Sequence, residues 1–485
     1  RGRNMFPIHP FLIGLYPIFA LYTQNMGIVP LGEILIPSII TLTFTALLFL
    51  VARLFHGNID KMALGITAFF LWFYSFGFSL GAYNQIIIGD IALNQYPRYL
   101  VFIYTGIFIT FIVYLWRLRS DFRTITRLLN IIAIVLIALP FLVAGFSLVT
   151  VDRNVQETVG AKAPPEISCI PNRSIQRDVY YIILDSYARD DVLDHSFHYN
   201  NSDFLSYLTA RGFQVSRRST ANYNLTRPSL ASSLNLNYIE NPDDRTDLQH
   251  MVEYNNMTLF FKDNGYTTIF FRSGYAMTER SPYSTVVMNN EILSAFQSKL
   301  LDVTLLKYIF TNENRRSAIS GAFSDLSTIP EIQGNTFVFA HIVAPHNPYI
   351  FSEDGGWVVP SFRDEDYIRQ LKYVNAQVEQ TIDTILEKSD VPPIIVLQAD
   401  HGPSMEAMKY ESRDIRMPIL NAYYLPEGRG NRIPDTITPV NSFRLILNEY
   451  YGCELPLLED RYFFNDVWYS TSPGDNMSAR YQENR

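Results

Sequence analysis

Residues 392–402 read Pro-Pro-Ile-Ile-Val-Leu-Gln-Ala-Asp-His-Gly, and this stretch indicates the fold of the larger part of the chain. Its middle is a short apolar run rich in β-branched residues, without helical spacing, and two prolines precede it. Such a run is typical of a strand that is buried on both faces of a parallel sheet. Ligands bind beyond the carboxyl ends of the strands in open α/β sheets. Asp400 and His401 follow this strand directly, so the stretch predicts half of a metal site.

Three other runs have the same character, and each leads to a polar or charged side chain. They are residues 179–184, followed by Asp185, residues 267–271, followed by Arg272, and residues 337–344, followed by Pro345-His346-Asn347-Pro348-Tyr349. Between the runs, residues 367–388 carry an apolar stripe at steps of three and four, and residues 441–451 continue similarly up to Gly452. Alternating strands and helices over residues 178–485 predict a doubly wound α/β domain.

The first 150 residues differ in character from the rest of the 485-residue chain. They contain nine Lys or Arg and four Asp or Glu, a net charge of +5, so the remainder carries −13 to give the total of −8. Five apolar stretches in this part are long enough to cross ~30 Å of hydrocarbon. These stretches are residues 10–24, 34–51, 63–80, 100–116 and 129–149. We therefore expect a transmembrane domain over residues 1–150, and the acidic remainder gives no reason to expect nucleic-acid binding.

The basic residues of this part predict its orientation. Arg1 and Arg3 precede the first stretch, Arg53 and Lys61 lie between the second and third, and four arginines lie between the fourth and fifth. The two other connections carry almost no positive charge. Because Lys and Arg accumulate in cytoplasmic loops, we expect a cytoplasmic N-terminus and an extracytoplasmic large domain.

Residues 151–177 are polar and rich in proline, which suits a juxtamembrane linker. The two cysteines, Cys169 and Cys453, lie near the beginning and near the end of the exported part. They either form one disulfide or remain unpaired thiols. The apolar helices either serve only as an anchor or also present a lipid-borne substrate to the outer domain.

A further candidate for chemistry is Thr226, in the stretch Asn222-Tyr-Asn-Leu-Thr-Arg-Pro-Ser-Leu-Ala-Ser-Ser-Leu234. Pro228 suits the first turn of a helix, which puts Thr226 at the helix N-terminus or just before it. Backbone N–H groups and the helix dipole stabilise an alkoxide and bind phosphate or sulfate oxygens there. Coordination to a divalent cation would let this hydroxyl ionise near neutral pH. Mn²⁺, Mg²⁺ or Zn²⁺ accepts such a mixed set of carboxylate and imidazole ligands. Taken singly, Asp185 is better explained as a turn or helix-capping residue, and Thr226 as an ordinary capping residue.

The order of these motifs resembles a known family. The motifs are Asp185 after a strand, Thr226-Arg-Pro-Ser229 opening a helix, Pro345-His-Asn-Pro-Tyr349 and Ala399-Asp-His-Gly402. Together they resemble the alkaline phosphatase superfamily, and within it the membrane-anchored sulfatase-like branch, which includes lipoteichoic acid synthases and lipid A phosphoethanolamine transferases. Those proteins also have about five spans before an outward-facing catalytic domain. The likeness covers the topology and nearly all of residues 178–485, and it implies a bacterial cytoplasmic membrane as the location.

The resemblance also implies residue roles by position. One divalent metal ion would be bound by Asp185, Thr226, Asp400 and His401. Thr226 would be the nucleophile that becomes transiently phosphorylated, and His346 would contact the transferred group or protonate the leaving oxygen. The substrate-binding candidates are Arg272, His341, His346 and Asn222. For His341, a core position within a strand is the favoured explanation.

Departures from the family pattern narrow the chemistry. Sulfatases need Cys or Ser at the nucleophile position, which is Thr226 here, so sulfatase activity is disfavoured. No histidine follows His401, which disfavours a second metal ion held fully by protein. The expected function is therefore transfer of a phosphoglycerol-type or phosphoethanolamine-type group from a membrane lipid to an envelope glycan or lipid acceptor. The alternatives are hydrolysis by the same site and a catalytically silent glycan-binding or scaffold protein.

Overall fold

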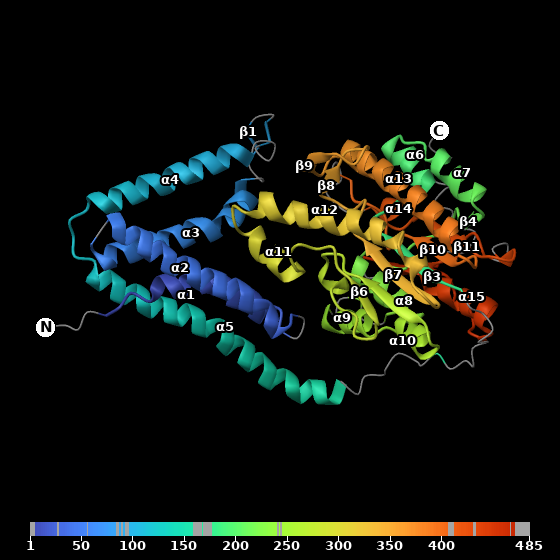
Figure 1. The fold of residues 1–485 in the computed structure, drawn as a ribbon, viewed down its shortest axis with the longest axis horizontal. Coiled ribbons are helices and arrows are strands. Elements are labelled where there is room, and N and C mark those ends of the chain that lie inside the picture. Colours follow the sequence, from blue (N-terminus) through green and yellow to red (C-terminus); the bar gives the residue numbers. More distant parts are fainter. Residues whose placement is uncertain are drawn as a thin grey trace. The chain divides into compact units, whose positions relative to one another are not determined.

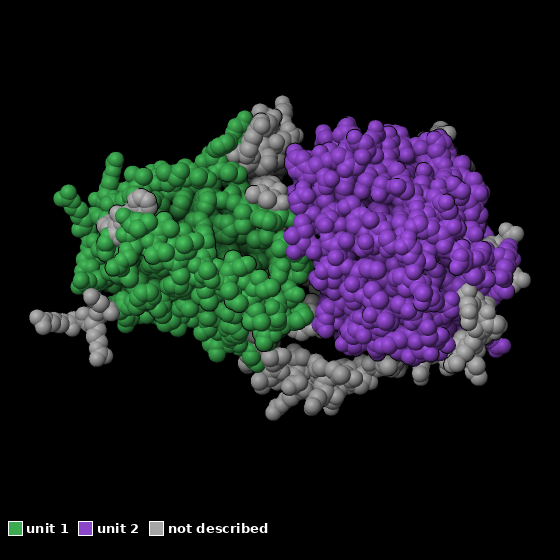
Figure 2. Space-filling view, in the orientation of Figure 1, with its two compact units in different colours: residues 1–162, 293–311 green, residues 163–292, 312–485 purple. Residues whose placement is uncertain are grey.

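The computed structural model describes residues 5–26, 29–55, 57–83, 87–88, 91–92, 97–158, 167, 177–239, 242, 245–405, 412–429, 433–465 and 467–470. The chain forms two compact units, coloured separately in Figure 2. The first comprises residues 1–162 and 293–311, and the second comprises residues 163–292 and 312–485. The first unit contains the apolar helices, and the second contains the α/β domain.

The first unit is a bundle of apolar helices. Its elements are α1 (His9–Gln24), the 3-10 turn Leu31–Ile34, α2 (Leu35–Phe55), α3 (Ile59–Tyr83), the short strands β1 (Ile87–Ile88) and β2 (Ile91–Ala92), α4 (Pro97–Arg117) and α5 (Arg123–Thr158). Among the residues that the structure describes, four helices, α2 to α5, are long and apolar enough to cross a membrane. Large apolar side chains such as Phe102, 72% exposed, and Leu142, 69% exposed, point outward from the bundle. Such a surface suits hydrocarbon rather than water.

Helix α1 is shorter than the other four apolar helices of the bundle. It has 16 residues, so it is about 24 Å long at roughly 1.5 Å per residue, short of the ~30 Å of hydrocarbon. Polar residues bound its apolar run at both ends, which limits its length. The helix nevertheless belongs to the bundle. The N–H groups of Ile8 and His9 donate to Asn130 Oδ1 of α5, each at 3.0 Å, and Ile18 packs against Ile34.

A segment from the second half of the sequence packs with these helices. Phe296 and Leu300 of α11 (Ala295–Asp302) are buried in one cluster with Ile18 and Ile34. The Gly77 N–H of α3 donates to the Val303 carbonyl at 2.9 Å. A Cβ on Gly77 would lie 2.5 Å from Val303 Cα, so only glycine allows this close approach. Residues 293–311, although they lie within the predicted soluble domain, are therefore part of the membrane unit.

The predicted linker is only partly described. Helix α5 continues to Thr158, so residues 151–158, which were predicted as a polar tether, are helical. Residues 159–166 and 168–176 lie outside the described residues. Cys453 is disulfide-bonded. Cys169, the other cysteine of the chain, lies outside the described residues.

The second unit is built on a seven-stranded sheet in the order β4-β11-β10-β3-β7-β5-β6. The strands are β3 (Val179–Leu184), β4 (Phe213–Val215), β5 (Thr267–Phe271), β6 (Val286–Met288), β7 (Thr336–Ile342), β10 (Ile394–Gln398) and β11 (Asn421–Tyr424). Only β11 runs antiparallel to its neighbours among these strands. The four strands predicted from apolar runs are all present, and they form adjacent positions in the parallel part.

Helices cover both faces of this sheet (Figure 1). Successive side chains of a strand point to opposite faces, so Tyr180 and Ile182 lie in one apolar cluster while Tyr181 and Ile183 lie in the other. One face is covered by α6 (Asp190–Phe197), α7 (Ser202–Ala210), α12 (Lys307–Leu326) and α13 (Asp364–Lys388). The other is covered by α8 (Thr226–Asn235), α9 (Arg245–Glu253), α10 (Asn256–Asp263) and α15 (Pro439–Tyr451). This confirms the doubly wound α/β prediction.

Smaller elements complete the unit. They are the 3-10 turns Ala276–Thr278 and Ile329–Glu331, the hairpins β8 (Tyr349–Phe351) with β9 (Trp357–Ser361) and β12 (Arg461–Phe464) with β13 (Val467–Ser470), and α14 (Arg413–Arg416). Helix α15 ends at Tyr451, and Gly452 follows it with a φ of 70°, the left-handed conformation expected of a helix-terminating glycine.

Candidate functional site

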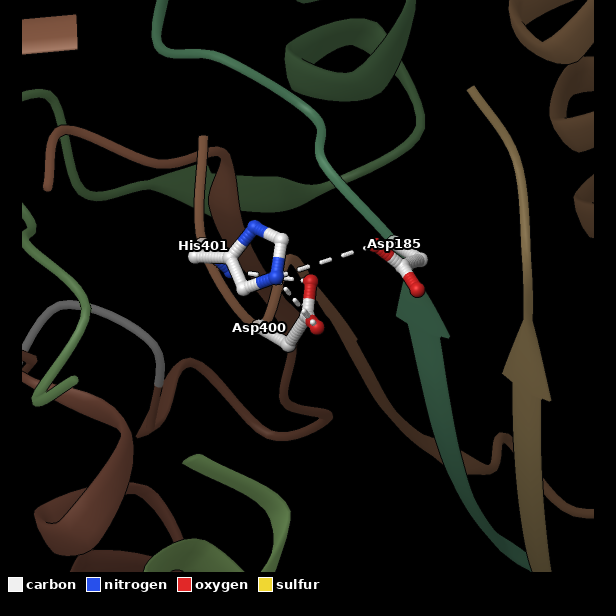
Figure 3. Close-up of side chains that lie close together, drawn as sticks. All are labelled: Asp185, Asp400 and His401. Carbon is white, nitrogen blue, oxygen red and sulfur yellow. Dashed lines mark hydrogen bonds and ion pairs between the residues drawn. The ribbon is translucent and has the colours of Figure 1, made fainter. Parts of the chain in front are cut away.

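Two adjacent parallel strands bring the predicted acids together. Strands β3 and β10 pair in register up to Ile183 and Gln398, and Asp185 and Asp400 each lie two residues beyond that pair. One ligand atom from each of Asp185, Asp400 and His401 lies within 4.8 Å of the others, and all three residues are buried. Figure 3 shows the His401 ring turned toward both carboxylates. The site therefore forms at the carboxyl edge of the sheet.

The hydrogen bonds of His401 determine which ring nitrogen carries the proton. Its Nδ1 lies 2.9 Å from the Gly402 carbonyl oxygen, which can only accept, so Nδ1 is protonated. The unprotonated Nε2 then faces Asp400 Oδ2 at 3.4 Å and Asp185 Oδ1 at 4.0 Å. Burial, followed by the positive charge of Arg416, lowers the pKa of His401 to about 3. The imidazole is therefore neutral and offers a lone pair, as a metal ligand must.

Thr226 is the first residue of α8 and is also buried at this site. Leu225, just before it, is extended, and Pro228 lies in the first turn of the helix. The Thr226 hydroxyl donates to His401 Nε2 at 3.1 Å. Because the first N–H groups of a helix lack intrahelical partners and carry the positive end of its dipole, this hydroxyl lies where negative oxygens are stabilised.

The two carboxylates have different surroundings. Asp185 accepts hydrogen bonds from the Ser186 hydroxyl at 2.9 Å and contacts His341 Nε2 at 3.3 Å. Burial alone would raise the pKa of Asp185, but the nearby imidazoles of His346 and His341 outweigh it and hold this pKa well below its ordinary value. For Asp400, burial and then the negative charge of Asp185 raise the pKa to about 6.

These residues fit a divalent cation. Asp400 Oδ1 accepts from the backbone N–H groups of Ser186 at 3.1 Å and His401 at 2.8 Å. Its buried Oδ2 has no hydrogen-bond partner within the described part of the chain. A buried oxygen without a partner beside a second carboxylate is costly, and a bound cation would relieve both the missing contact and the repulsion. Two carboxylates, one neutral imidazole and one hydroxyl are donors that Mg²⁺, Mn²⁺ or Zn²⁺ accepts.

His346 lies across the site from these ligands. Its ring centroid is 6.4 Å from that of His401, and the side chain is half-buried. Its Nδ1 donates to the Asn347 carbonyl at 2.5 Å, so Nε2 is the unprotonated nitrogen of a neutral ring. Arg315 of α12 holds this loop, because its guanidinium donates to the carbonyl oxygens of Val343 at 2.9 Å, His346 at 2.5 Å and Asn347 at 2.7 Å.

The three remaining candidates lie in different surroundings. His341 is buried between Asp185 and the Thr278 hydroxyl, which is 3.2 Å from Nδ1. Arg272 forms ion pairs with Glu279 and with Glu291, the latter at 3.1 Å. Asn222 donates from its amide to the Arg461 carbonyl at 2.9 Å and accepts from the Val440 N–H at 2.9 Å. The structure thus brings together Asp185, Thr226, Asp400, His401, His341 and His346, whereas Arg272 and Asn222 make contacts with other parts of the fold.

Two arginines of the site have no recognisable motif in the sequence. Arg315 holds the His346 loop, as described above. Arg416 of α14 donates to the carbonyl oxygens of Gly402 and Asn224, each at 2.6 Å, and lies 3.4 Å from His401 Nε2. It therefore joins the loop after β10 to the loop before Thr226. Neither arginine lies at a fixed spacing from a motif, so the sequence alone offers no signal for them.

The ion pairs of Arg272 lead to a pH prediction. Burial, then the negative charge of Glu279, raises the pKa of Glu291 from 4.5 to about 8 despite the positive charge of Arg272. Between these pH values the folded protein keeps a proton that the unfolded chain loses. The free energy of unfolding should therefore fall by up to ~1.4 kcal/mol per pH unit as the pH rises through this window.

We expect Glu291→Gln to flatten this slope and to raise the melting temperature at pH 7, measured by thermal unfolding from pH 5 to 9. Glu353→Gln, at an exposed ion pair with Lys372, is the control, and an unchanged slope in Glu291→Gln would contradict the prediction.

Comparison with known proteins identifies the family. Residues 177–441 match the family model described as Sulfatase. Because this match covers more than half of the chain, the protein belongs to the sulfatase family, as the ordered motifs predicted. No curated protein sequence matches the chain.

Several solved structures resemble the fold at a distance. The C-terminal periplasmic domain of EptC from Escherichia coli, in complex with zinc, has 13% identity and a TM-score of 0.47, and the match covers 65% of this chain and 99% of that domain. The integral membrane lipooligosaccharide phosphoethanolamine transferase A from Neisseria meningitidis has 11% identity and a TM-score of 0.43. That match covers 90% of this chain and 95% of the transferase chain. The periplasmic domain of phosphoethanolamine transferase EptC from Campylobacter jejuni has 10% identity and a TM-score of 0.40, with 58% and 92% covered.

Proposed function

We propose that this protein is a membrane-bound, metal-dependent phosphotransferase that forms a covalent intermediate on Thr226. The observation that carries the proposal is the position of the Thr226 hydroxyl. It begins a helix, it lies 3.1 Å from the unprotonated nitrogen of His401, and that nitrogen faces two buried carboxylates. A hydroxyl in such surroundings is an activated nucleophile. A threonine cannot become formylglycine, so phosphoryl chemistry is favoured over sulfate hydrolysis.

Asp185, Asp400, His401 and Thr226 would hold one divalent metal ion. When bound, the ion supplies positive charge that lowers the pKa of a hydroxyl and neutralises phosphate oxygens. The protein contributes the fixed geometry. The backbone N–H groups of Ser186 and His401 orient Asp400, the Gly402 carbonyl orients His401, and His341 orients Asp185.

The reaction has two displacement steps. In the first, Thr226 Oγ1 attacks the phosphorus of a phospholipid head group, a P–O bond to Thr226 forms, and the P–O bond to diacylglycerol breaks. Thr226 loses one proton and diacylglycerol gains one. His346 delivers the proton that diacylglycerol gains. In the second step, a hydroxyl of an envelope glycan or lipid attacks phospho-Thr226, and the threonine hydroxyl is restored. The group carried is of the phosphoglycerol or phosphoethanolamine type.

The proposed location follows from the charges of the helix bundle. The basic residues gather at one end of α2 to α5, because Arg119 lies in the connection between α4 and α5, and Arg53, Lys61, Arg117 and Arg123 lie in the helix turns next to the two connections there. With the basic end in the cytoplasm, residues that follow α5 lie outside the cell. The N-terminus is cytoplasmic because α1 begins at this same end, where Asn130 of α5 accepts its first N–H groups. The donor lipid is then a lipid of the outer leaflet of a bacterial cytoplasmic membrane.

Mass spectrometry of the Thr226 peptide tests the proposal. The full chain, purified in detergent with a divalent metal ion, is incubated with phosphatidylethanolamine or phosphatidylglycerol and then digested. We expect the Thr226 peptide to gain the mass of one head-group phosphate, and the mass to name the group. Asp400→Asn should show no adduct and little bound metal, whereas the exposed Asp354→Asn control should match the wild type. Release of the head group to water without an acceptor would favour hydrolysis. A chain that binds no divalent ion and forms no adduct would favour the catalytically silent alternative.

Arg315 provides a second test, because it acts through the His346 loop rather than through the metal ligands. We expect Arg315→Met to slow single-turnover adduct formation by roughly tenfold to a hundredfold, since a misplaced catalytic group costs that much. The metal content should stay at the wild-type value. Arg316→Met is the control, because Arg316 lies over the Phe351 ring at 5.2 Å. Loss of metal together with loss of rate would show that Arg315 supports the whole site and not this loop.

A further inference from the structure

A polar cavity lies at one end of the membrane unit. Its wall contains none of the candidate metal-site residues. Its volume is about 490 Å³. It is lined by the connection between α2 and α3, by the connection between α4 and α5, by the first turns of α3 and α5, and by Met5. The residues of interest in its wall are Asp60, Arg119, Asp121, Arg123, Thr126 and Arg127. The opposite ends of the same helices carry Ile34 and Gly77, where residues 293–303 pack.

The charges of this cavity favour an anion. Arg123 forms an ion pair with Asp121 at 3.8 Å, but the two side chains are 62% and 73% exposed, so the pair contributes little. Over the described ranges, neither Arg119 nor Arg127 forms an ion pair, and both are exposed. The wall carries three arginines against Asp60 and Asp121, a net charge of +1, and guanidinium suits phosphate geometry.

A buried hydroxyl marks the inner wall. Thr126 is 1% exposed, and its Oγ1 has no hydrogen-bond partner among the residues that the structure describes. Its backbone N–H is already used, because it donates to the Phe122 carbonyl at 2.9 Å. A buried hydroxyl without a partner is costly, so an acceptor oxygen in the cavity would stabilise it. Thr126 lies in the first turn of α5, where the helix dipole also favours an anion.

The wall is held in place before any ligand arrives. Lys61 donates from Nζ to the carbonyl oxygens of Trp116 at 2.9 Å and Leu118 at 2.8 Å, which fixes the end of α4 just before Arg119. The Arg123 N–H donates to Asp121 Oδ1 at 3.0 Å, which fixes the start of α5. The arginines thus extend from an ordered connection, and less ordering is needed on binding.

Apolar side chains beside the cavity indicate that the anion is the head group of a lipid. Leu54, Trp116 and Leu128 are close in sequence to cavity residues, and they are 78%, 55% and 57% exposed. They belong to helices long and apolar enough to cross a membrane. An anion at this level of the bundle therefore has hydrocarbon chains next to it, and basic pockets between membrane helices are a recurrent setting for phospholipid head groups.

We propose that this cavity binds the phosphate of an anionic phospholipid, with the phosphate at Arg119, Arg127 and the Thr126 hydroxyl. Because basic connections are cytoplasmic by the positive-inside rule, the lipid belongs to the cytoplasmic leaflet. The site is distinct from the proposed donor lipid, which lies in the outer leaflet, and it does not depend on the proposed transferase reaction.

Native mass spectrometry of the full chain in detergent tests this proposal by titration with dimyristoylphosphatidylglycerol. We expect Arg119→Gln/Arg127→Gln to raise the Kd at least about twentyfold, because each basic residue near a membrane surface contributes roughly a fivefold change. Arg53→Gln/Arg117→Gln removes two exposed arginines from the same end of the bundle but outside the cavity wall. This matched control should change the Kd by less than about threefold. Thr126→Val, which keeps every charge and nearly the same volume, should raise the Kd about fivefold.

The outcomes separate the ligands as well as the residues. Phosphatidylcholine should bind weakly, and millimolar inorganic phosphate should leave bound phosphatidylglycerol in place. Equal Kd values for the two double variants would overturn the proposal, because the effect would then be general charge attraction. A Thr126→Val variant with wild-type affinity would also overturn it. Displacement of the lipid by inorganic phosphate would show a site for the free anion and would overturn the lipid assignment.

Discussion

Replacing Thr226 by alanine is expected to lower the transfer rate by at least about a thousandfold, because the covalent route then has no attacking oxygen. Residual turnover would reflect direct attack by water at the assembled site. Thr226→Ser keeps a hydroxyl at the start of α8 and should retain a measurable fraction of the wild-type rate. The measurement is the release of labelled diacylglycerol from a phospholipid by the full chain in detergent, together with detection of the adduct on residue 226.

Ser229 offers a matched control for Thr226. It lies on the same helix, three residues later, and its hydroxyl donates to the Tyr223 carbonyl at 3.1 Å instead of to a site residue. Ser229→Ala therefore removes one buried hydroxyl of the Thr226-Arg-Pro-Ser229 motif without touching the proposed chemistry. The nucleophile assignment would be wrong if Thr226→Ala kept more than a small part of the wild-type rate while its melting temperature stayed unchanged.

The parts of the site that could be predicted from sequence are those that follow local rules. A β-branched run followed by an acid places that acid at the carboxyl edge of a parallel sheet, and Asp185 and Asp400 do lie side by side there. Pro228 marks a helix start, and Thr226 is the first residue of α8. These rules need only the nearest residues, so they hold without knowledge of the tertiary fold.

The parts that could not be predicted depend on contacts between distant segments. Arg315 reaches the carbonyl oxygens near His346 from a helix some thirty residues earlier in the chain, and Arg416 reaches Gly402 and Asn224. Arg272 follows a strand as a substrate-binding residue might, yet Glu279 and Glu291 pair with it. In each case tertiary packing determines which groups the side chain contacts, and a short sequence pattern does not encode that packing.

Replacing Gly402 by alanine is expected to remove most metal binding. The loss of metal affinity should be roughly tenfold to a hundredfold, as for other substitutions of residues that orient metal ligands. An alanine Cβ would lie 2.1 Å from the Ile415 carbonyl oxygen. This oxygen belongs to the backbone, so no side-chain rotation can relieve the clash. The Gly402 N–H donates to the Arg416 carbonyl at 2.7 Å, and the Gly402 carbonyl accepts from Arg416 at 2.6 Å and from His401 Nδ1 at 2.9 Å. If the loop after β10 moves away from α14, the Gly402 carbonyl is displaced as well. His401 then loses the acceptor that keeps the proton on Nδ1 and keeps Nε2 unprotonated.

Metal content per chain and the metal Kd, measured on the detergent-purified full chain beside its melting temperature, distinguish this local effect from unfolding. Gly106→Ala is the control, because no atom lies within 4 Å of a Cβ at that position of α4. We expect Gly402→Ala to lose metal affinity while much of the fold survives, since the clash lies in two loops beyond the strand ends rather than in the sheet. Wild-type metal affinity in Gly402→Ala would mean that the loop after β10 can move away from α14 without disturbing His401, and the close approach would then have no role in holding the ligand.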